Sequence, residues 1–190
     1  EHLVFDGAPH LTLMAFPGMR ERTVRIGSAG KTFSMTGWRI GYVSGPARLI
    51  EGVMKAHQFI AYTCPPHLQK AVAEGLGFPD GYFADFIAAL QKKRDLMTAL
   101  LKDAGLDPIP CEGTYFVSAD IRGVGGKDDA QFCRDLTAKA GVAAVPVSAF
   151  YPEGDASAPR HLARFCFCKK IDVLEAAGAR LKRYFGGRSV

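Results

Sequence analysis

The amino-acid sequence predicts an α/β fold in which helices pack on a small sheet. Short runs rich in β-branched and aromatic residues, bounded by glycines and prolines, are typical of strands. Longer segments carry apolar residues at every third or fourth position, which indicates one apolar face of a helix. In the second half of the chain these two kinds of segment alternate, and this alternation favours helices layered on a sheet.

The first half is predicted to contain two strands joined by a polar turn, followed by two helices. The turn holds Lys31, and a proline stands at the start of each helix, where its missing N–H costs nothing. The elements are the strands 23–27 and 39–43, a helix from Pro46 through His57, and a helix from Pro65–Pro66 toward Gly75.

The second half is predicted to begin with a long amphipathic helix from Asp80, which Gly105 ends. We therefore expect a domain boundary near Phe78–Pro79, giving domains 1–78 and 79–190. The later elements alternate in type: a strand at 115–119, a helix at 128–140, strands at 142–147 and 162–168, and a helix at 172–185.

Composition narrows the class of protein. The net charge of +5 comes from interspersed charges of both signs, which suits small anionic ligands better than a nucleic-acid groove. The longest segment without a charged residue, 56–69, is too short and too polar to cross a membrane. Five cysteines without a C-x-x-C pair argue against a disulfide framework or a zinc site. We expect a reduced, cytoplasmic protein without metal, membrane or nucleic-acid partners.

One segment contains several reactive and ligand-binding side chains close together. Its sequence is Ser28-Ala-Gly-Lys-Thr-Phe-Ser-Met-Thr-Gly-Trp-Arg-Ile-Gly41. Lys31 lies among small residues and hydroxyls, and Arg39 follows eight positions later. Hydroxyl and guanidinium groups suit a phosphate dianion. A lysine among uncharged neighbours and beside a second cation suits Schiff-base chemistry with an aldehyde. Pyridoxal 5′-phosphate is a cofactor that needs both features, whereas the alternative is a solvated lysine beside a strand-edge arginine.

This segment resembles the signature of class I/II aminotransferases of fold type I. The resemblance implies that Lys31 is the catalytic Schiff-base lysine, that Ser28 and Arg39 bind the cofactor phosphate, and that residues 1–78 are the C-terminal part of the cofactor-binding large domain. Residues 79–190 are then the α/β small domain. The motif is typical of the branch that contains kynurenine, glutamine and methionine aminotransferases.

Two further site residues follow from the same resemblance. Tyr62, just before Cys64-Pro65-Pro66, resembles an aromatic residue that the family lends across its dimer interface to the cofactor site; packing is the alternative. Arg164 resembles the arginine that binds the substrate α-carboxylate. Period-two alternation also places Arg164 on one strand face with Leu162, Cys166 and Cys168, where an arginine needs an anion, although an internal glutamate could supply it.

The resemblance implies transfer of an amino group between a neutral, sulfur-containing or aromatic α-amino acid and a 2-oxo acid, by a homodimer. The aspartate that pairs with the cofactor ring nitrogen is expected before Glu1, and Asp6 lies too far along the chain for that role. We therefore interpret the chain as the C-terminal half of the enzyme, inactive alone.

Two other functions stay open: a carbon–sulfur β-lyase of the same shape, and the aminotransferase-like effector domain of a transcription regulator. A basic module that binds polyanions by net charge alone has little support, because no basic patch is concentrated in the sequence.

Overall fold

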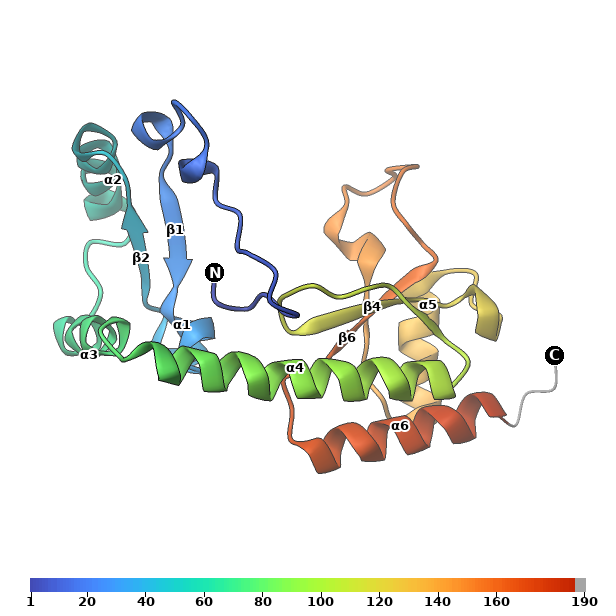
Figure 1. Ribbon diagram of the computed structural model, residues 1–190. Helices are drawn as coiled ribbons and strands as arrows, with labels where there is room; N and C mark the ends of the chain where they lie inside the picture. The colour runs from blue at the N-terminus through green and yellow to red at the C-terminus, as the bar shows by residue number, and fades with distance from the viewer. Residues whose placement is uncertain (187–190) are drawn as a thin grey trace. The chain divides into compact units, whose positions relative to one another are not determined.

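The computed structural model describes residues 1–186, which form two compact units (Figure 1). The first contains Glu1–His2 and Pro9–Ala84, and the second contains Leu3–Ala8 and the chain from Asp85 onward. The division falls inside helix α4 (Asp80–Asp103), whereas the sequence placed a boundary just before that helix. The α/β class is confirmed, because each unit combines helices with a sheet.

The first unit is built on an antiparallel pair of strands. β1 (Arg25–Ser28) pairs with β2 (Gly41–Ser44), so that Ser28 lies opposite Gly41 and Gly27 lies opposite Tyr42. Both predicted strands therefore exist, each shifted toward its C-terminal end. The single-turn helices of this unit are η1 (Leu13–Ala15), η2 (Arg20–Arg22), α1 (Ala29–Thr32) and η3 (Thr36–Trp38).

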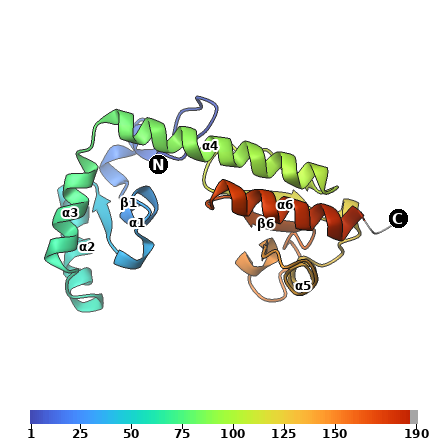
Figure 2. The same cartoon turned by 90° about the horizontal axis from the view of Figure 1, so that it is seen from below.

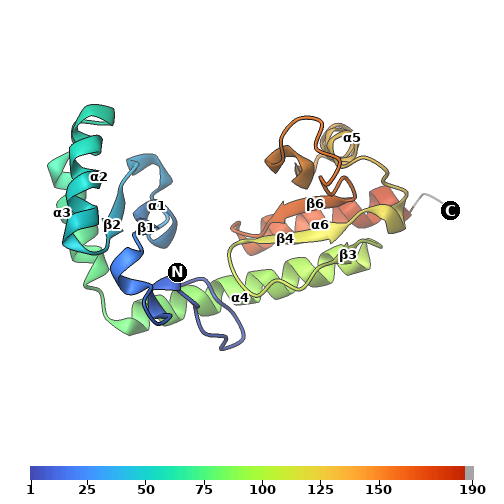
Figure 3. The same cartoon turned by 90° about the horizontal axis from the view of Figure 1, so that it is seen from above.

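Both predicted helices of the first unit are present: α2 (Ala47–Ile60) and α3 (Pro66–Leu76). Pro46 occupies the position before α2, and Pro66 is the first residue of α3, as their fixed φ favours. In Figures 1 and 3, α2 runs beside β2. The small buried core consists of Ala29, Ile40 and Val72, with Phe33, Met35, Cys64 and Leu68 packed against it.

The second unit contains a four-stranded antiparallel sheet with the order β3-β4-β6-β5. The central pair places Ser118 opposite Arg164 and Phe116 opposite Cys166. The predicted strand at 142–147 is shorter than expected: only Val145 and Pro146 pair with β6, and a 3₁₀ turn, η6 (Val147–Phe150), follows directly. The strands are β3 (Asp107–Pro108), β4 (Phe116–Asp120), β5 (Val145–Pro146) and β6 (Leu162–Cys166).

Helices α4 and α6 (Ile171–Gly186) run side by side in this unit (Figures 1 and 2). Gly178 permits their close approach, because a Cβ added there would lie 2.4 Å from Cδ2 of Leu100. The predicted helix 128–140 consists of α5 (Asp129–Asp135) and a π-helical continuation, η5 (Leu136–Ala140). Asp128 caps α5 by accepting a hydrogen bond from the N–H of Gln131. A short 3₁₀ turn, η4 (Arg122–Val124), follows β4.

The core of the second unit lies between the sheet and these helices. Phe5 reaches it from the segment Leu3–Ala8, which a bridge between Val4 and Gly113 holds in place. The largest fully buried side chains of this core are those of Phe5, Leu101, Val117, Ile121, Leu136, Phe165, Phe167, Leu174 and Leu181. None of the helices within residues 1–186 is long and apolar enough to cross a membrane.

Candidate active site

Lys31 lies in a loop that the β1–β2 pair closes at its base. Ser28 ends β1 and pairs with Gly41, the first residue of β2, so the chain between them forms one closed excursion. Its first turn is the short helix α1, on which Lys31 is exposed while Thr32 is buried. The predicted polar turn is therefore partly helical, and this local helix separates a solvent-facing lysine from residues that face the core.

Ser28 and Arg39 stand at the two ends of this loop. Ser28 occupies the position before α1, yet its hydroxyl does not cap the helix and its side chain is exposed. Arg39 is also exposed, and its Nη1 donates to the carbonyl of Thr36 at 3.3 Å. The pairing of Ser28 with Gly41 fixes both residues at the same end of the strand pair.

The loop backbone is held in an uncommon conformation. Arg39 has φ = 57° and Ser34 has φ = 54°, in the left-handed region that residues other than glycine rarely adopt. Such backbone costs about 1–3 kcal/mol per residue and persists only where surrounding contacts enforce it. Gly30 supplies one of those contacts, because a Cβ there would lie 3.1 Å from the Cα of Thr36. The loop is thus a packed structure.

These residues fit pyridoxal 5′-phosphate. A primary amine, a hydroxyl that caps no helix and an exposed guanidinium lie on one closed loop, and they provide an aldehyde-reactive group and two donors for a phosphate dianion. Within residues 1–186, no group of three or more histidine, cysteine, aspartate or glutamate side chains could hold a metal ion.

Tyr62 lies outside this loop, just beyond the end of α2. Its residue surface is 82% exposed, and its backbone is also left-handed, with φ = 60°. Its N–H donates to the carbonyl of His57 at 3.2 Å, which closes the last turn of the helix. Its predicted contact with the cofactor across a dimer interface remains a prediction.

Tyr42 is a group near the loop that the sequence did not single out. Burial and a hydrogen bond to the Glu1 carboxylate raise the pKa of Tyr42 to about 12. Arg25 is 3.2 Å from the same carboxylate and lies over the tyrosine ring. At neutral pH Tyr42 is therefore a neutral hydrogen-bond donor, and it is no candidate for a proton acceptor.

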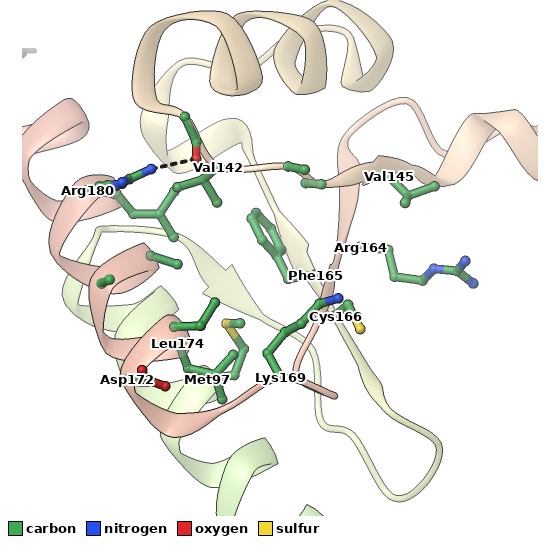
Figure 4. Close-up of a pocket in the computed structure, with 17 residues that line it drawn as sticks. Met97, Val142, Val145, Arg164, Phe165, Cys166, Lys169, Asp172, Leu174 and Arg180 are labelled. Carbon is green, nitrogen blue, oxygen red and sulfur yellow. Dashed lines mark hydrogen bonds between the residues drawn. The ribbon is translucent and has the colours of Figure 1, made fainter. Parts of the chain in front are cut away.

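Arg164 belongs to the second unit, and strand alternation places it as predicted. Ala163, Phe165 and Phe167 are buried in the core, whereas Arg164 and Cys166 lie on the other, half-exposed face. Figure 4 shows the Arg164 side chain extending away from Leu174 and Met97. The Arg164 side chain thus does not lie among the apolar residues of the core.

The surroundings of Arg164 are aromatic. Its guanidinium carbon is 4.0 Å from the ring centroid of Phe116 and 4.3 Å from that of Phe150, and its Nε is buried without a hydrogen-bond partner among the described residues. Sequence reasoning missed both phenylalanines. The position of Phe116 follows from the β4–β6 register, which one sequence does not reveal. Phe150 is separated from β6 in the sequence by the loop 151–161, so its contact with Arg164 could not be predicted either.

A cavity of about 630 Å³ lies beside β6 (Figure 4). Phe165, Leu174, Val142 and Met97 line it, and Arg180 at its border donates to the carbonyl of Gly141 at 3.1 Å. Val145, Arg164 and Cys166 also line this cavity, and the guanidinium of Arg164 points away from its apolar side.

Comparison with known proteins agrees with this architecture. Residues 1–179 match the family model described as aminotransferase class I and II. The chain is 44% identical over 187 residues to a probable N-succinyldiaminopimelate aminotransferase of Mycobacterium tuberculosis, covering 95% of this chain and 47% of that protein. A solved structure of N-succinyldiaminopimelate aminotransferase from that organism superposes with a TM-score of 0.90 at 45% identity, over 96% of this chain and 47% of that one.

Two further relatives have other stated activities. A kynurenine–oxoglutarate transaminase of Dictyostelium discoideum is 39% identical, over 93% of this chain and 45% of that protein. A methionine aminotransferase of Escherichia coli is also 39% identical, over 96% of this chain and 47% of that protein. The chain therefore spans about half the length of the curated relatives it matches.

The chain belongs to the class I and II aminotransferase family, and its fold is that of the fold-type I enzymes. Members of this family are enzymes that use pyridoxal 5′-phosphate, in agreement with the amine, hydroxyl and guanidinium on the Lys31 loop.

Proposed function

We propose that the protein containing this chain transfers an amino group between a neutral, sulfur-containing or aromatic α-amino acid and a 2-oxo acid, with pyridoxal 5′-phosphate as cofactor. The observation that carries the proposal is the closed loop between β1 and β2, which presents Lys31 together with Ser28 and Arg39. The stated activities of the kynurenine and methionine relatives support this substrate class.

Lys31 is the catalytic residue in this proposal. Lys31 would hold the cofactor through its aldehyde, and the amine of Lys31, once free, would accept the proton released from the substrate α-carbon. Its exposed place on α1 leaves the amine accessible to small molecules. When bound, the cofactor supplies a ring that accepts the electrons released at that carbon.

Ser28 and Arg39 bind the cofactor phosphate in this proposal. A hydroxyl and a guanidinium at one end of a strand pair donate hydrogen bonds to different oxygens of a dianion, and the arginine also supplies opposite charge. The strained backbone at Arg39 fixes where its side chain leaves the loop. Tyr62 completes the cofactor site from a second copy of the chain, in keeping with its exposed ring.

Arg164 binds the substrate α-carboxylate in this proposal. A planar guanidinium donates two parallel hydrogen bonds to a carboxylate, a geometry that lysine cannot provide. Its half-exposed position and its buried, unpartnered Nε support a role toward an external anion. We also propose a homodimer and a cytoplasmic location; the five free cysteines are consistent with a reducing compartment.

Borohydride reduction of the full-length protein saturated with pyridoxal phosphate tests the central claim. Reduction fixes a lysine–cofactor bond, and peptide mapping then locates it. We expect the label on Lys31, its loss in Lys31→Ala, and its retention in the control variant Lys55→Ala, in which a salt-bridged lysine on α2 is removed. A label on another lysine would reject the site. Product analysis separates an aminotransferase, which yields a 2-oxo acid that keeps the substrate side chain together with a new amino acid, from a β-lyase, which yields a thiol, ammonia and pyruvate.

A further inference from the structure

The aromatic residues around Arg164 form a clamp, which we define as Phe116 and Phe150. The guanidinium carbon of Arg164 lies about equally far from the two ring centroids, at 4.0 and 4.3 Å. A cation over the face of an aromatic ring is attracted by the ring's negative face. Two rings confine the guanidinium to a narrow set of orientations without using any of its N–H donors, so those donors stay available to a ligand.

The sheet fixes the first ring of the clamp. Phe116 pairs with Cys166, and Ser118 pairs with Arg164, so Phe116 is the diagonal neighbour of Arg164 on the same face. Diagonal neighbours on an antiparallel pair are within reach of aromatic and long side chains. The position of this ring is therefore set by backbone pairing in the centre of the sheet.

The second ring depends on a buried carboxylate. Phe150 is the last residue of η6 and is 59% exposed, so its own packing holds it weakly. The same turn carries Ser148, whose N–H donates to Oδ2 of Asp129 at 2.7 Å and whose hydroxyl donates to Oδ1 at 2.7 Å. Asp129 is completely buried at the start of α5, and both of its oxygens are thus used to hold this turn.

We propose that the clamp positions the Arg164 guanidinium for a substrate carboxylate, and that Asp129 acts through Ser148 to fix Phe150. The inference rests on the proposed function, because it assumes that Arg164 binds the α-carboxylate. Phe116, Phe150, Ser148 and Asp129 are positioning residues in this scheme. They set the affinity for carboxylate substrates and leave the chemistry at Lys31 unchanged.

Steady-state kinetics of the full-length holoenzyme test the clamp. Phe150→Leu removes the ring and should raise KM for both the amino acid and the 2-oxo acid up to about fivefold, as expected for the loss of a partly exposed cation–π contact. kcat at saturation and the cofactor absorbance should stay close to those of the unaltered protein. Phe150→Tyr keeps an aromatic face and should restore KM, whereas Tyr151→Leu removes the next aromatic residue along the chain and should leave KM unchanged.

A double-mutant cycle tests the link to the buried carboxylate. Ser148→Ala deletes one of the two hydrogen bonds to Asp129 and should raise KM by about threefold. If Ser148 acts only through Phe150, then Ser148→Ala combined with Phe150→Leu raises KM no further than Phe150→Leu alone. Independent, multiplicative effects would overturn the link. Asp129→Asn keeps the shape of the side chain. It should also raise KM, and combining it with Phe150→Leu should raise KM no further than Phe150→Leu alone.

Arg164→Gln distinguishes failure of the inference from failure of the proposed function. If Arg164→Gln raises KM strongly but Phe150→Leu leaves it unchanged, the clamp is wrong and the carboxylate site stands. If Arg164→Gln leaves KM unchanged, both are wrong. The affinity for a carboxylate-free amine of the same side chain should be equal in Phe150→Leu and the unaltered protein, and a loss there would show general disruption and overturn the clamp.

Discussion

Arg94 and Asp6, which are 88 positions apart in the sequence, form a two-pronged ion pair in the second unit. Each terminal nitrogen of the Arg94 guanidinium donates to one carboxylate oxygen of Asp6, and both distances are 2.8 Å. Arg94 also donates to the carbonyl of Cys111 at 2.7 Å and lies over the ring of Phe5. One side chain therefore joins α4, the segment Leu3–Ala8 and the chain that leads into β4.

This arrangement predicts that Arg94→Lys destabilises the second unit. Lysine keeps the charge, but one ammonium group cannot reproduce the paired donors to Asp6 together with the bond to Cys111. We expect the thermal unfolding midpoint of the full-length protein to fall by several degrees. Arg183→Lys, at an exposed position on α6, is the matched control and should leave the midpoint unchanged. Equal midpoints for the two variants would contradict the prediction.

The same pair predicts a loss of stability in acid. The hydrogen bond from Arg94 lowers the pKa of Asp6 below its ordinary value. A carboxyl group with a depressed folded-state pKa stabilises the fold above its unfolded-state pKa, and this contribution disappears as the pH falls through the lower, folded-state value. Urea denaturation between about pH 6 and pH 3 should therefore show a smaller loss of stability in Asp6→Asn than in the unaltered protein. Parallel pH profiles for the two proteins would refute the assignment.

Two helix glycines should respond in opposite directions to alanine. Replacing a glycine inside a helix ordinarily stabilises it by up to about 1 kcal/mol. Gly52 on α2 has open space around its missing Cβ, so Gly52→Ala should stabilise the protein. At Gly178 the new methyl group would lie 2.4 Å from Cδ2 of Leu100, and overpacking of this kind costs about 1–3 kcal/mol.

Denaturation midpoints would measure both changes. We expect Gly178→Ala to lower the midpoint, and Gly178→Ala combined with Leu100→Ala to recover part of the loss that overpacking causes. If Gly178→Ala raised the midpoint as Gly52→Ala does, the close packing of α4 against α6 would be wrong.

The sequence predicted that Ser28, Lys31 and Arg39 share one turn, the site proposed for the cofactor, because the chemistry of this segment is local. Lys31, Ser28 and Arg39 lie within twelve positions, and strand signals on both sides predicted that they belong to one turn. Most of the helices and strands were also predicted, since proline, glycine and apolar spacing mark them in the sequence. The change from the α-helix α5 to the π-helix η5 was not predicted. It alters the backbone hydrogen-bond pattern but leaves the spacing of the apolar residues almost unchanged.

The environment of Arg164 could not be predicted in the same way. Alternation indicated the face on which Arg164 lies, but the identity of its neighbours depends on how β4 pairs with β6. Phe150 contacts Arg164 from a turn that the buried Asp129 holds through Ser148. The sequence contains no pattern that predicts this link between Ser148 and Asp129. Contacts that join distant segments through single side chains, as Arg94 and Asp6 do, are set by tertiary packing.

Arg39→Lys should weaken binding of the cofactor while leaving the loop folded. The substitution preserves the positive charge, and the backbone strain at φ = 57° stays the same. The variant therefore loses only the planar pair of N–H donors that arginine offers to a phosphate. We expect the dissociation constant for pyridoxal phosphate to rise about tenfold, measured by absorbance titration of the full-length apoprotein. Arg48→Lys on α2, whose side chain donates to the carbonyl of Glu21, provides the control. An unchanged affinity in Arg39→Lys would remove Arg39 from the phosphate site.

The cysteines should differ sharply in their rate of alkylation, because the thiolate is the form that reacts with an alkylating reagent. Burial, together with the nearby Asp129 carboxylate, raises the pKa of Cys133 to about 11, so about one Cys133 side chain in a thousand is ionised at pH 8. Cys168 is exposed. Iodoacetamide at pH 8 should therefore modify Cys168 rapidly and Cys133 only after unfolding in urea, as peptide mass spectrometry would measure. Cys168→Ser should abolish the rapid phase. Early labelling of Cys133 in the folded protein would contradict its burial on α5, the helix on which Asp129 holds Ser148.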